Sequence, residues 1–284
     1  MTSEKLALFA GFRLILAAGR RLTTGGQMFD HLFNMSLDLN TILRDWPHEN
    51  GTIKVRKIVG LDGRQKLQLR LDLGVLQMEV TGRPDGRRPH NYESLLAYHQ
   101  SCAARAEEKG DYYELSPQQC TELQQEGIQY YHRYLSLFQI NDFAGVVRDT
   151  QRNLDLFDFV LAHTNREELS WGLQQFRPYV LMMNTRAKAS IFLSQGRFPE
   201  AISEIKRGRD AIADFFQRSN FPELASKSSE INFLDEWLEE VRVKRPLSKL
   251  ETMEREMQTA IAKELYERAA ELRDAIRLLK ANGC

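Results

Sequence analysis

The chain has 284 residues, of which 42% are hydrophobic and 27% are charged. These proportions are typical of globular proteins and exclude an intrinsically disordered or fibrous chain. Lys and Arg number 39, and Asp and Glu also number 39, so the molecule as a whole has no net charge that would attract a polyanion. The length suits about two domains at roughly 150 residues each.

The N-terminal segment is mostly apolar over residues 6–22, but Arg13 interrupts it. Because its uninterrupted run is much shorter than the roughly 18 residues of a membrane-spanning helix, we expect no membrane contact. A signal peptide is not expected either, since the basic pair follows the apolar run instead of preceding it. We expect residues 1–27 to be a flexible extension, which either belongs to the native protein or precedes a start at Met28 or Met35.

The three cysteines lie far apart, at Cys102, Cys120 and Cys284. None has the paired spacing that a zinc knuckle or a redox dithiol requires. We therefore expect a protein of the reducing cytoplasm that holds no metal ion and no cofactor.

A small α+β domain with a β-hairpin is expected over residues 28–100, because apolar and polar residues alternate over 52–80. Asp62-Gly63 is typical of a tight turn between antiparallel strands. The alternation changes phase at Gly74, which indicates a bulge or a turn into a third strand. The apolar residues of the pattern are Ile53, Val55, Leu67, Leu69, Leu71 and Leu73, then Leu76, Met78 and Val80.

A basic loop follows this sheet, and residues 54–90 hold nine Lys or Arg against four Asp or Glu. Arg83, Arg87 and Arg88 lie among glycines and prolines, where flexible arginines can bind the phosphates of a nucleic acid. Alternatively, arginines on the outer face of a half-buried sheet keep its edge soluble. The absence of an interleaved aromatic pattern favours this alternative.

The rest of the chain has helical periodicity, with helix starts near Pro117 and Pro199. At the first start, Ser116 and Gln119 have the spacing of a capping box, and the proline stands at the first helical position. Since no long Gly or Ser linker interrupts residues 101–241, we expect a single helical domain there.

An internal repeat with an offset of 55 residues runs through this helical domain. The matching pairs are Tyr134 and Ala189, Leu137 and Phe192, Asn141 and Gly196, Phe143 and Phe198, Val146 and Ala201, and Asn153 and Gly208. The small residues and the glycine turn of the second copy resemble a tetratricopeptide helix pair, which implies a concave peptide-binding surface. A plain helical bundle explains the spacing equally well. Because 55 residues exceed that family's 34, an extra or longer helix that contains Trp171, Phe176 and Tyr179 is expected.

A separate helical hairpin is predicted at the C-terminus, over residues 247–281. Pro246 ends the preceding helix, and Ser248 with Glu251 has capping-box spacing. Two seams of apolar residues at intervals of three and four follow, with a break near 262–264. The first seam holds Leu250, Met253, Met257 and Ala260, and the second holds Leu265, Ala269, Leu272, Ile276 and Leu279.

The same hairpin also carries a specific cluster of residues. It consists of Leu250-Glu251, Met253 and Met257, then Tyr266-Glu267-Arg268-Ala269-Ala270-Glu271-Leu272-Arg273-Asp274 with Ile276 and Leu279. This cluster resembles the UVR motif of the UvrB and UvrC excision-repair proteins, although Tyr266 stands where phenylalanine is more usual. The motif also serves as a partner-binding element in certain chaperone ATPases and their adaptors. The resemblance therefore implies an interaction module, and it covers about an eighth of the chain.

One seam is not expected to bury enough apolar surface to order the hairpin alone. Ile261, Tyr266 and Ala270 remain as a second, narrower apolar stripe. We expect this stripe, with Glu267, Arg273 and Asp274 around it, to bind a like hairpin, a UVR-bearing partner or the helical domain of this chain.

Enzymatic activity is not expected, because the sequence contains no phosphate-binding loop, dinucleotide fingerprint or zinc-protease motif. The histidines are scattered, and a site that combines His90 and His99 with Glu93 or Arg87 is the weaker alternative. The sequence favours a non-enzymatic adaptor whose hairpin recruits a protein partner. The alternative function is an accessory DNA-repair factor with a basic domain that contacts nucleic acid.

Overall fold

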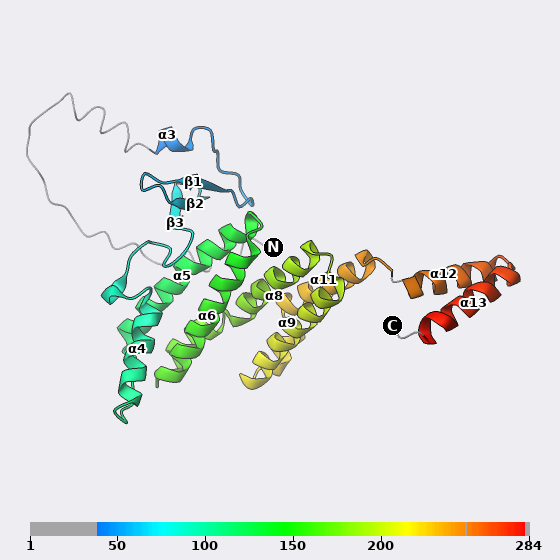
Figure 1. The fold of residues 1–284 in the computed structure, drawn as a ribbon. Helices are drawn as coiled ribbons and strands as arrows, with labels where there is room; N and C mark the ends of the chain where they lie inside the picture. Colours follow the sequence, from blue (N-terminus) through cyan, green and yellow to red (C-terminus); the bar gives the residue numbers. More distant parts are fainter. Residues whose placement is uncertain (1–38, 248, 282–284) are drawn as a thin grey trace, which may run out of the picture. The chain divides into compact units, whose positions relative to one another are not determined.

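The computed structural model describes residues 39–247 and 249–281. The extension predicted over residues 1–27 therefore lies outside the described residues. In the described part the fold is mainly helical, with a small antiparallel sheet toward the N-terminus, as the sequence predicts (Figure 1). Contacts between residues divide the chain into two compact units, and the division falls after Ile191.

The first unit contains the sheet and the helices up to most of α8. Its elements are α3 (Asn40–Leu43), β1 (Val55–Val59), β2 (Gln65–Arg70), β3 (Val75–Glu79), the 3-10 helix η1 (Pro89–Asn91), α4 (Leu95–Glu107), α5 (Pro117–Gln139), α6 (Phe143–His163), α7 (Glu167–Gln174) and α8 (Arg177–Ser194). Helices α5 and α6 lie side by side (Figure 1). They form the central part of this unit.

The second unit is entirely helical in its described residues. Its elements are α9 (Phe198–Arg218), α10 (Pro222–Ala225), α11 (Ser229–Lys244), α12 (Lys249–Ala262) and α13 (Tyr266–Ala281). Helix α9 packs against α10 and α11, and α12 packs against α13.

The sheet is an antiparallel meander in the order β1-β2-β3. The predicted turn at Asp62-Gly63 is present, and Gly63 has a φ of +73°, which glycine adopts without steric cost. Leu67 and Leu69 of β2 are buried, and β2 contacts α5. The alternation of the sequence therefore identified the inward face of β2 correctly.

The change of phase at Gly74 is a turn into the third strand. The Leu71 N–H donates to the Gly74 carbonyl at 2.9 Å, and β3 begins at the next residue. Leu73 stands in this turn and is exposed. It does not continue the inward face as the alternation predicts, because the chain has already left the strand.

The predicted capping box at the start of α5 is confirmed. The Ser116 hydroxyl accepts from the backbone N–H of Gln119, while the Gln119 side chain accepts from the Ser116 N–H. This reciprocal pair supplies partners for two N–H groups that the helix itself leaves without acceptors.

The internal repeat is visible in the bounds of the helices. Helices α5 and α8 end 55 residues apart, and α6 and α9 share the same offset at both ends. The turn between each pair contains a residue with positive φ, Asn141 at +59° and Gly196 at +72°. Helix α7 lies within the long period and contains Trp171, as predicted. Phe176 follows its end and Tyr179 belongs to α8, so one helix does not contain all three residues. The resemblance of this repeat to tetratricopeptide repeats remains a prediction.

A buried ion pair joins α5, α6 and the segment after β3. The guanidinium of Arg133 makes two hydrogen bonds with the Asp149 carboxylate, at 2.6 and 2.8 Å, and both side chains are buried. The same guanidinium donates to the backbone carbonyls of Glu79 and Gly82 at 3.1 and 2.7 Å. A single arginine thus fixes the end of the sheet to the helices.

A second buried carboxylate, that of Glu126 in α5, holds the first turn of α4. It accepts from the backbone N–H groups of Leu95 and Leu96 at 2.8 and 3.2 Å. Arg83 lies 3.1 Å from the same carboxylate, and Arg152 also pairs with it. The negative charge at the start of α4 also complements the helix dipole.

The compact units are not the predicted domains, whose bounds remain a prediction. The predictions separated a sheet domain over 28–100 from a helical domain over 101–241. In the structure the sheet shares one unit with α4–α7 and most of α8, and the division by contacts falls after Ile191.

No helix in residues 39–247 or 249–281 is long and apolar enough to cross a membrane.

Candidate partner-binding hairpin

Helices α12 and α13 form the antiparallel hairpin that the sequence predicts at the C-terminus. The break falls between Ala262 and Tyr266, where it was expected. In this turn the Leu265 N–H donates to the Ala260 carbonyl at 2.8 Å, and Glu264 has a φ of +58°. The predicted cap at Ser248 lies outside the described residues.

The seam between the two helices is short and filled by small and branched side chains. Its buried residues are Ala260, Ala269, Leu272 and Ile276. Four other predicted seam residues are partly buried, namely Leu250, Met253, Met257 and Leu279. Leu265 is 54% exposed, so its assignment to the seam was wrong. It belongs to the turn, which the periodicity of a helix does not describe.

The hairpin also has ion pairs at its surface, both between the two helices and within α13. Lys280 of α13 reaches Glu254 of α12 at 2.8 Å. The expected local pair between Arg273 and Asp274 is also present, at 3.0 Å, with both side chains well exposed. Exposed pairs of this kind contribute only about 0–1 kcal/mol to stability. The seam therefore has the larger part in holding the hairpin.

The predicted apolar stripe is open to solvent in this chain. Ile261 is 45% exposed and Tyr266 is 68% exposed, while Ala270 is partly buried. Tyr266, Ala270 and Arg273 follow one another at intervals of four and three, which places them on one face of α13. An exposed isoleucine and an exposed tyrosine thus accompany a hairpin whose seam is already filled.

The charged members of the predicted set lie beside this stripe. Glu267, Arg273 and Asp274 are all exposed. Glu267 and Asp274 are seven residues apart and share a second face of α13. Five of the six predicted residues therefore come from α13, and only Ile261 comes from α12.

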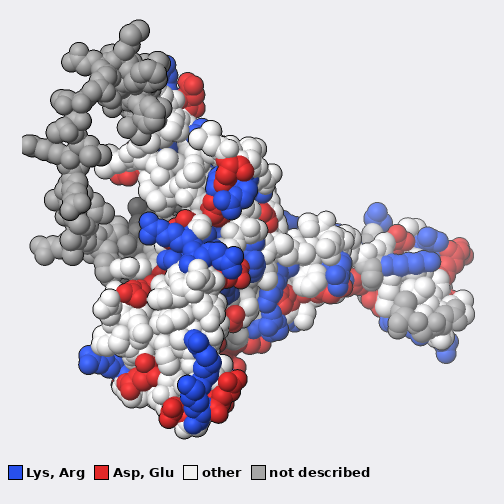
Figure 2. Space-filling model, turned by 60° about the vertical axis from the view of Figure 1, so that its left-hand side comes forward, with Lys and Arg blue, Asp and Glu red and all other residues white. Residues whose placement is uncertain are grey.

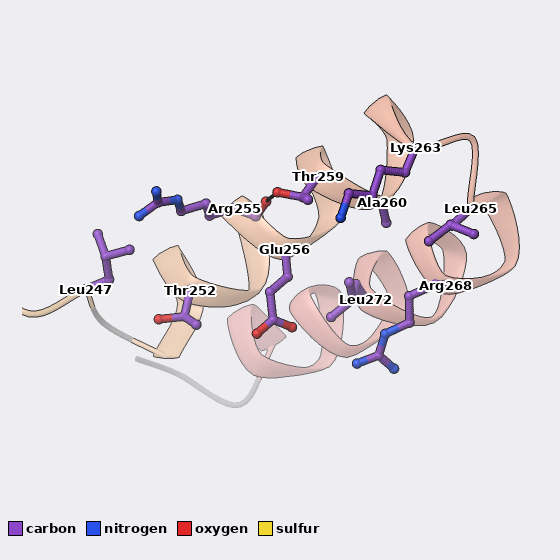
Figure 3. Close-up of a pocket in the computed structure, with 10 residues that line it drawn as sticks. All are labelled: Leu247, Thr252, Arg255, Glu256, Thr259, Ala260, Lys263, Leu265, Arg268 and Leu272. Atoms are coloured by element: carbon purple, nitrogen blue, oxygen red, sulfur yellow. Dashed lines mark hydrogen bonds between the residues drawn. The ribbon is translucent and has the colours of Figure 1, made fainter.

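Both helices also line an open groove (Figure 3). Figure 3 shows Glu256 reaching from α12 toward α13, with Leu265 and Leu272 on the α13 side. The groove residues are Leu247, Thr252, Arg255, Glu256, Thr259, Ala260, Lys263, Leu265, Arg268 and Leu272. Sequence reasoning did not identify this groove. It assigned Ala260, Leu265 and Leu272 to the seams and gave the other groove residues no role.

The basic loop has far fewer free cations than the sequence suggests. Arg83 is largely buried and paired with Glu126, so its guanidinium already has a structural partner. Arg87 and Arg88 are exposed and form no ion pair with any residue that the structure describes. The structure does not bring the three predicted arginines together as equivalent phosphate ligands.

Other cations of this region are paired as well, and Figure 2 shows basic and acidic side chains interspersed over the visible face. Lys54 pairs with Glu49, Lys57 lies 3.5 Å from Asp142, and Lys66 pairs with both Asp62 and Glu79. Three of the acidic partners, Glu49, Glu126 and Asp142, lie outside residues 54–90. The local charge count could not include them.

The two histidines of the weaker alternative have packing contacts. His90 stacks on Tyr98 with ring centroids 4.0 Å apart. His99 is buried, its Nδ1 lies 2.6 Å from the Tyr113 hydroxyl, and burial lowers the pKa of its imidazole. Burial also raises the pKa of Tyr113 to about 12. His99 and Tyr113 thus share a hydrogen bond, and which of the two donates depends on the tautomer of the imidazole.

Across the described ranges, no three His, Cys, Asp or Glu side chains gather in a way that could hold a metal ion.

A family model described as the UvrB/uvrC motif matches residues 248–282. No curated protein and no solved structure matches the chain. The matched range coincides with α12 and α13, so the C-terminal hairpin is a UVR motif. Such motifs occur in excision-repair proteins and mediate protein interactions.

Proposed function

We propose that this protein is a non-enzymatic adaptor whose UVR hairpin recruits a protein partner. The observation that carries the proposal is the exposure of Ile261 and Tyr266 beside a seam that is already filled. Because neither side chain contributes to the buried seam, both remain available to a partner.

The size of these side chains suits them as anchors in an interface. Complete burial of a large apolar side chain contributes roughly 1.5–3 kcal/mol. Tyrosine is also enriched among the residues that dominate binding energies, since its ring is large and its hydroxyl can stay near water. Glu267, Arg273 and Asp274 around the anchors would set orientation and partner choice more than affinity.

The alternative, an accessory DNA-repair factor that contacts nucleic acid, has less support. Binding to a phosphate backbone requires several free cations that act together. Arg83 is paired with Glu126, which leaves Arg87 and Arg88 as the free members of the predicted set. The known occurrence of the motif in excision-repair proteins is compatible with an adaptor that works in such a setting through protein contacts.

An affinity pull-down with three forms of the full chain tests the adaptor role. The first is the intact chain, the second carries Ile261→Gln and Tyr266→Gln, and the third carries Leu278→Gln as a matched control. Leu278 is an exposed leucine of the same hairpin. Glutamine is a good helix former, so none of the three changes should disturb the helices.

We expect the double variant to lose at least nine tenths of the captured partner, while the control retains it. Circular dichroism should give the same helical content for all three forms. If the double variant captures the same partners in the same amounts, the exposed stripe is not a recruiting surface and the proposal is wrong.

A further inference from the structure

We propose that the groove on the other flank of the hairpin binds an acidic amphipathic helix of a partner. The inference rests on the proposed function in that both place a protein on the hairpin. It uses different residues, however, so the two surfaces can be tested separately.

The spacing of the groove residues places them together. Thr252, Glu256, Thr259 and Lys263 follow one another along α12 at intervals of four, three and four, which is one face of a helix. Ile261 comes two residues after Thr259, which corresponds to about 200° around the helix axis. The groove and the exposed stripe therefore lie on opposite flanks of α12.

The same separation holds on the second helix. Leu265, Arg268 and Leu272 line the groove at intervals of three and four. Tyr266 precedes Arg268 by two residues and therefore points to a different side of α13. One hairpin thus presents two surfaces, and a protein seated on one does not cover the other.

The groove has an apolar floor that suits the side chains of a helix. Ala260 and Leu272 are buried beneath it, while Leu265 and Leu247 are about half exposed at its ends. Short threonines at Thr252 and Thr259 leave room on the α12 side. An amphipathic helix inserts its apolar row into a groove of this kind.

The side chains around the apolar floor are mainly basic, which favours a partner with acidic residues. Arg255, Lys263 and Arg268 supply three positive charges, against the single carboxylate of Glu256. Arg268 pairs with Glu271 at 2.9 Å, which is not among the groove residues. Arg255 and Lys263 form no ion pair with any residue in the described part of the chain. A partner with carboxylates beside its apolar row would complement both cations.

A second copy of this hairpin fits the groove less well. Residues 247–281 contain seven basic and seven acidic side chains. The positive excess is therefore local to the groove, and another hairpin brings no net negative charge to it. An acidic helix from a different protein is the occupant with the better electrostatic match.

A displayed library of helical peptides tests the inference. Its members carry apolar residues at positions i, i+3, i+4 and i+7 and random residues elsewhere, and they are selected on the full-length chain. A selected peptide is then synthesised, and its affinity is measured by fluorescence anisotropy against the intact chain and three variants. The groove variant is Arg255→Glu with Lys263→Glu, the stripe variant is Ile261→Gln with Tyr266→Gln, and the charge control is Lys249→Glu with Arg277→Glu.

We expect the selected peptides to be enriched in Asp and Glu. The synthesised peptide should bind at least tenfold more weakly to the groove variant and within twofold of the intact chain to the stripe variant and the charge control. A selection without acidic enrichment, or equal binding to the groove variant, overturns the inference.

Two further results separate this inference from its alternatives. Light scattering that finds a dimer of the intact chain and a monomer of the groove variant would assign the groove to a second copy and overturn the proposal. Loss of peptide binding in the stripe variant alone would move the peptide to the opposite flank, which supports the adaptor role but contradicts the groove. Failure of the adaptor pull-down leaves the peptide measurement intact, because the two use different residues.

Discussion

The charged side chain of Arg133 stabilises the fold from a buried position. Its guanidinium is buried and makes several polar contacts and one aromatic contact. It pairs with Asp149, donates to two backbone carbonyls, and lies 4.8 Å from the ring centroid of Tyr130. Buried charges persist only when such partners replace the lost water.

Replacing Arg133 with methionine should lower the free energy of unfolding by about 3–5 kcal/mol, because the buried Asp149 loses its main partner. Arg148 also contacts Asp149, which should keep the loss toward the lower end. Urea unfolding measures the change. The double variant Arg133→Met with Asp149→Leu should recover part of the loss. An unchanged midpoint in the single variant would mean that the pair does not support the native state.

The buried imidazole of His99 is expected to make the free energy of unfolding depend on pH. Burial lowers the pKa of its imidazole in the folded chain, so the unfolded chain takes up the proton first as the pH falls. The contribution of His99 is therefore complete above the ordinary value of about 6.5 and is lost as the pH falls below it. His99→Gln should show a smaller loss of stability between pH 7.5 and 5.5 than the intact chain. Urea unfolding at both pH values measures this, and parallel curves would contradict it.

Single elements were the features that the sequence predicted best, since their signals are local. The capping box of α5 spans four residues, and the turn at Asp62-Gly63 spans two. The UVR hairpin is also local, because its two seams and their break lie within 35 consecutive residues of the chain. Leu265 was misassigned because the apolar periodicity continues into the turn, where side-chain directions no longer follow it.

The backbone conformation of Glu264 predicts that replacing this residue with glycine stabilises the hairpin. Its φ of +58° lies in the left-handed region, which costs an L-residue about 1–2 kcal/mol. Glycine avoids this cost but loses about 0.5–1 kcal/mol through its greater freedom in the unfolded chain. Glu264→Gly should therefore stabilise the hairpin by about 0.5–1 kcal/mol. Hydrogen exchange of the α13 amides measures the effect.

The matched control for this change is Glu267→Gly, in the first turn of α13. Glycine within a helix costs about 1 kcal/mol. Exchange should therefore become faster in the control and slower in Glu264→Gly. Faster exchange in both variants would show that the turn does not favour glycine.

At the scale of the whole molecule, the sequence could not predict how distant residues neutralise one another. Glu126 and Arg83 are 43 positions apart, and Lys57 and Asp142 are 85 apart. These pairs exist only because the sheet and the helices share a unit. The sequence therefore could not show that Arg83 of the candidate phosphate site is paired with Glu126. The candidate partner site lies within one hairpin, where five of its six residues are exposed, and its role remains a prediction.

Because most cations of the loop region are paired within the chain, we expect the affinity for nucleic acid to depend only weakly on salt concentration. If Arg87 and Arg88 are the free cations of the loop, the logarithm of the association constant should fall by no more than about 2 per tenfold rise in salt, since each released counterion contributes about 0.9. Titration of the intact chain into labelled single- and double-stranded DNA at several salt concentrations measures this slope. A slope steeper than about 4 would mean that the internal ion pairs open toward DNA.

The bonds from Glu126 to the start of α4 connect segments that are remote in sequence. The amides of Leu95 and Leu96 belong to α4, but the group that holds them is about 30 positions later in the chain. During synthesis α4 leaves the ribosome before the residue that completes its first turn. The beginning of α4 therefore acquires its final bonding only after Glu126 of α5 has been synthesised, so this turn forms later than the rest of its helix can.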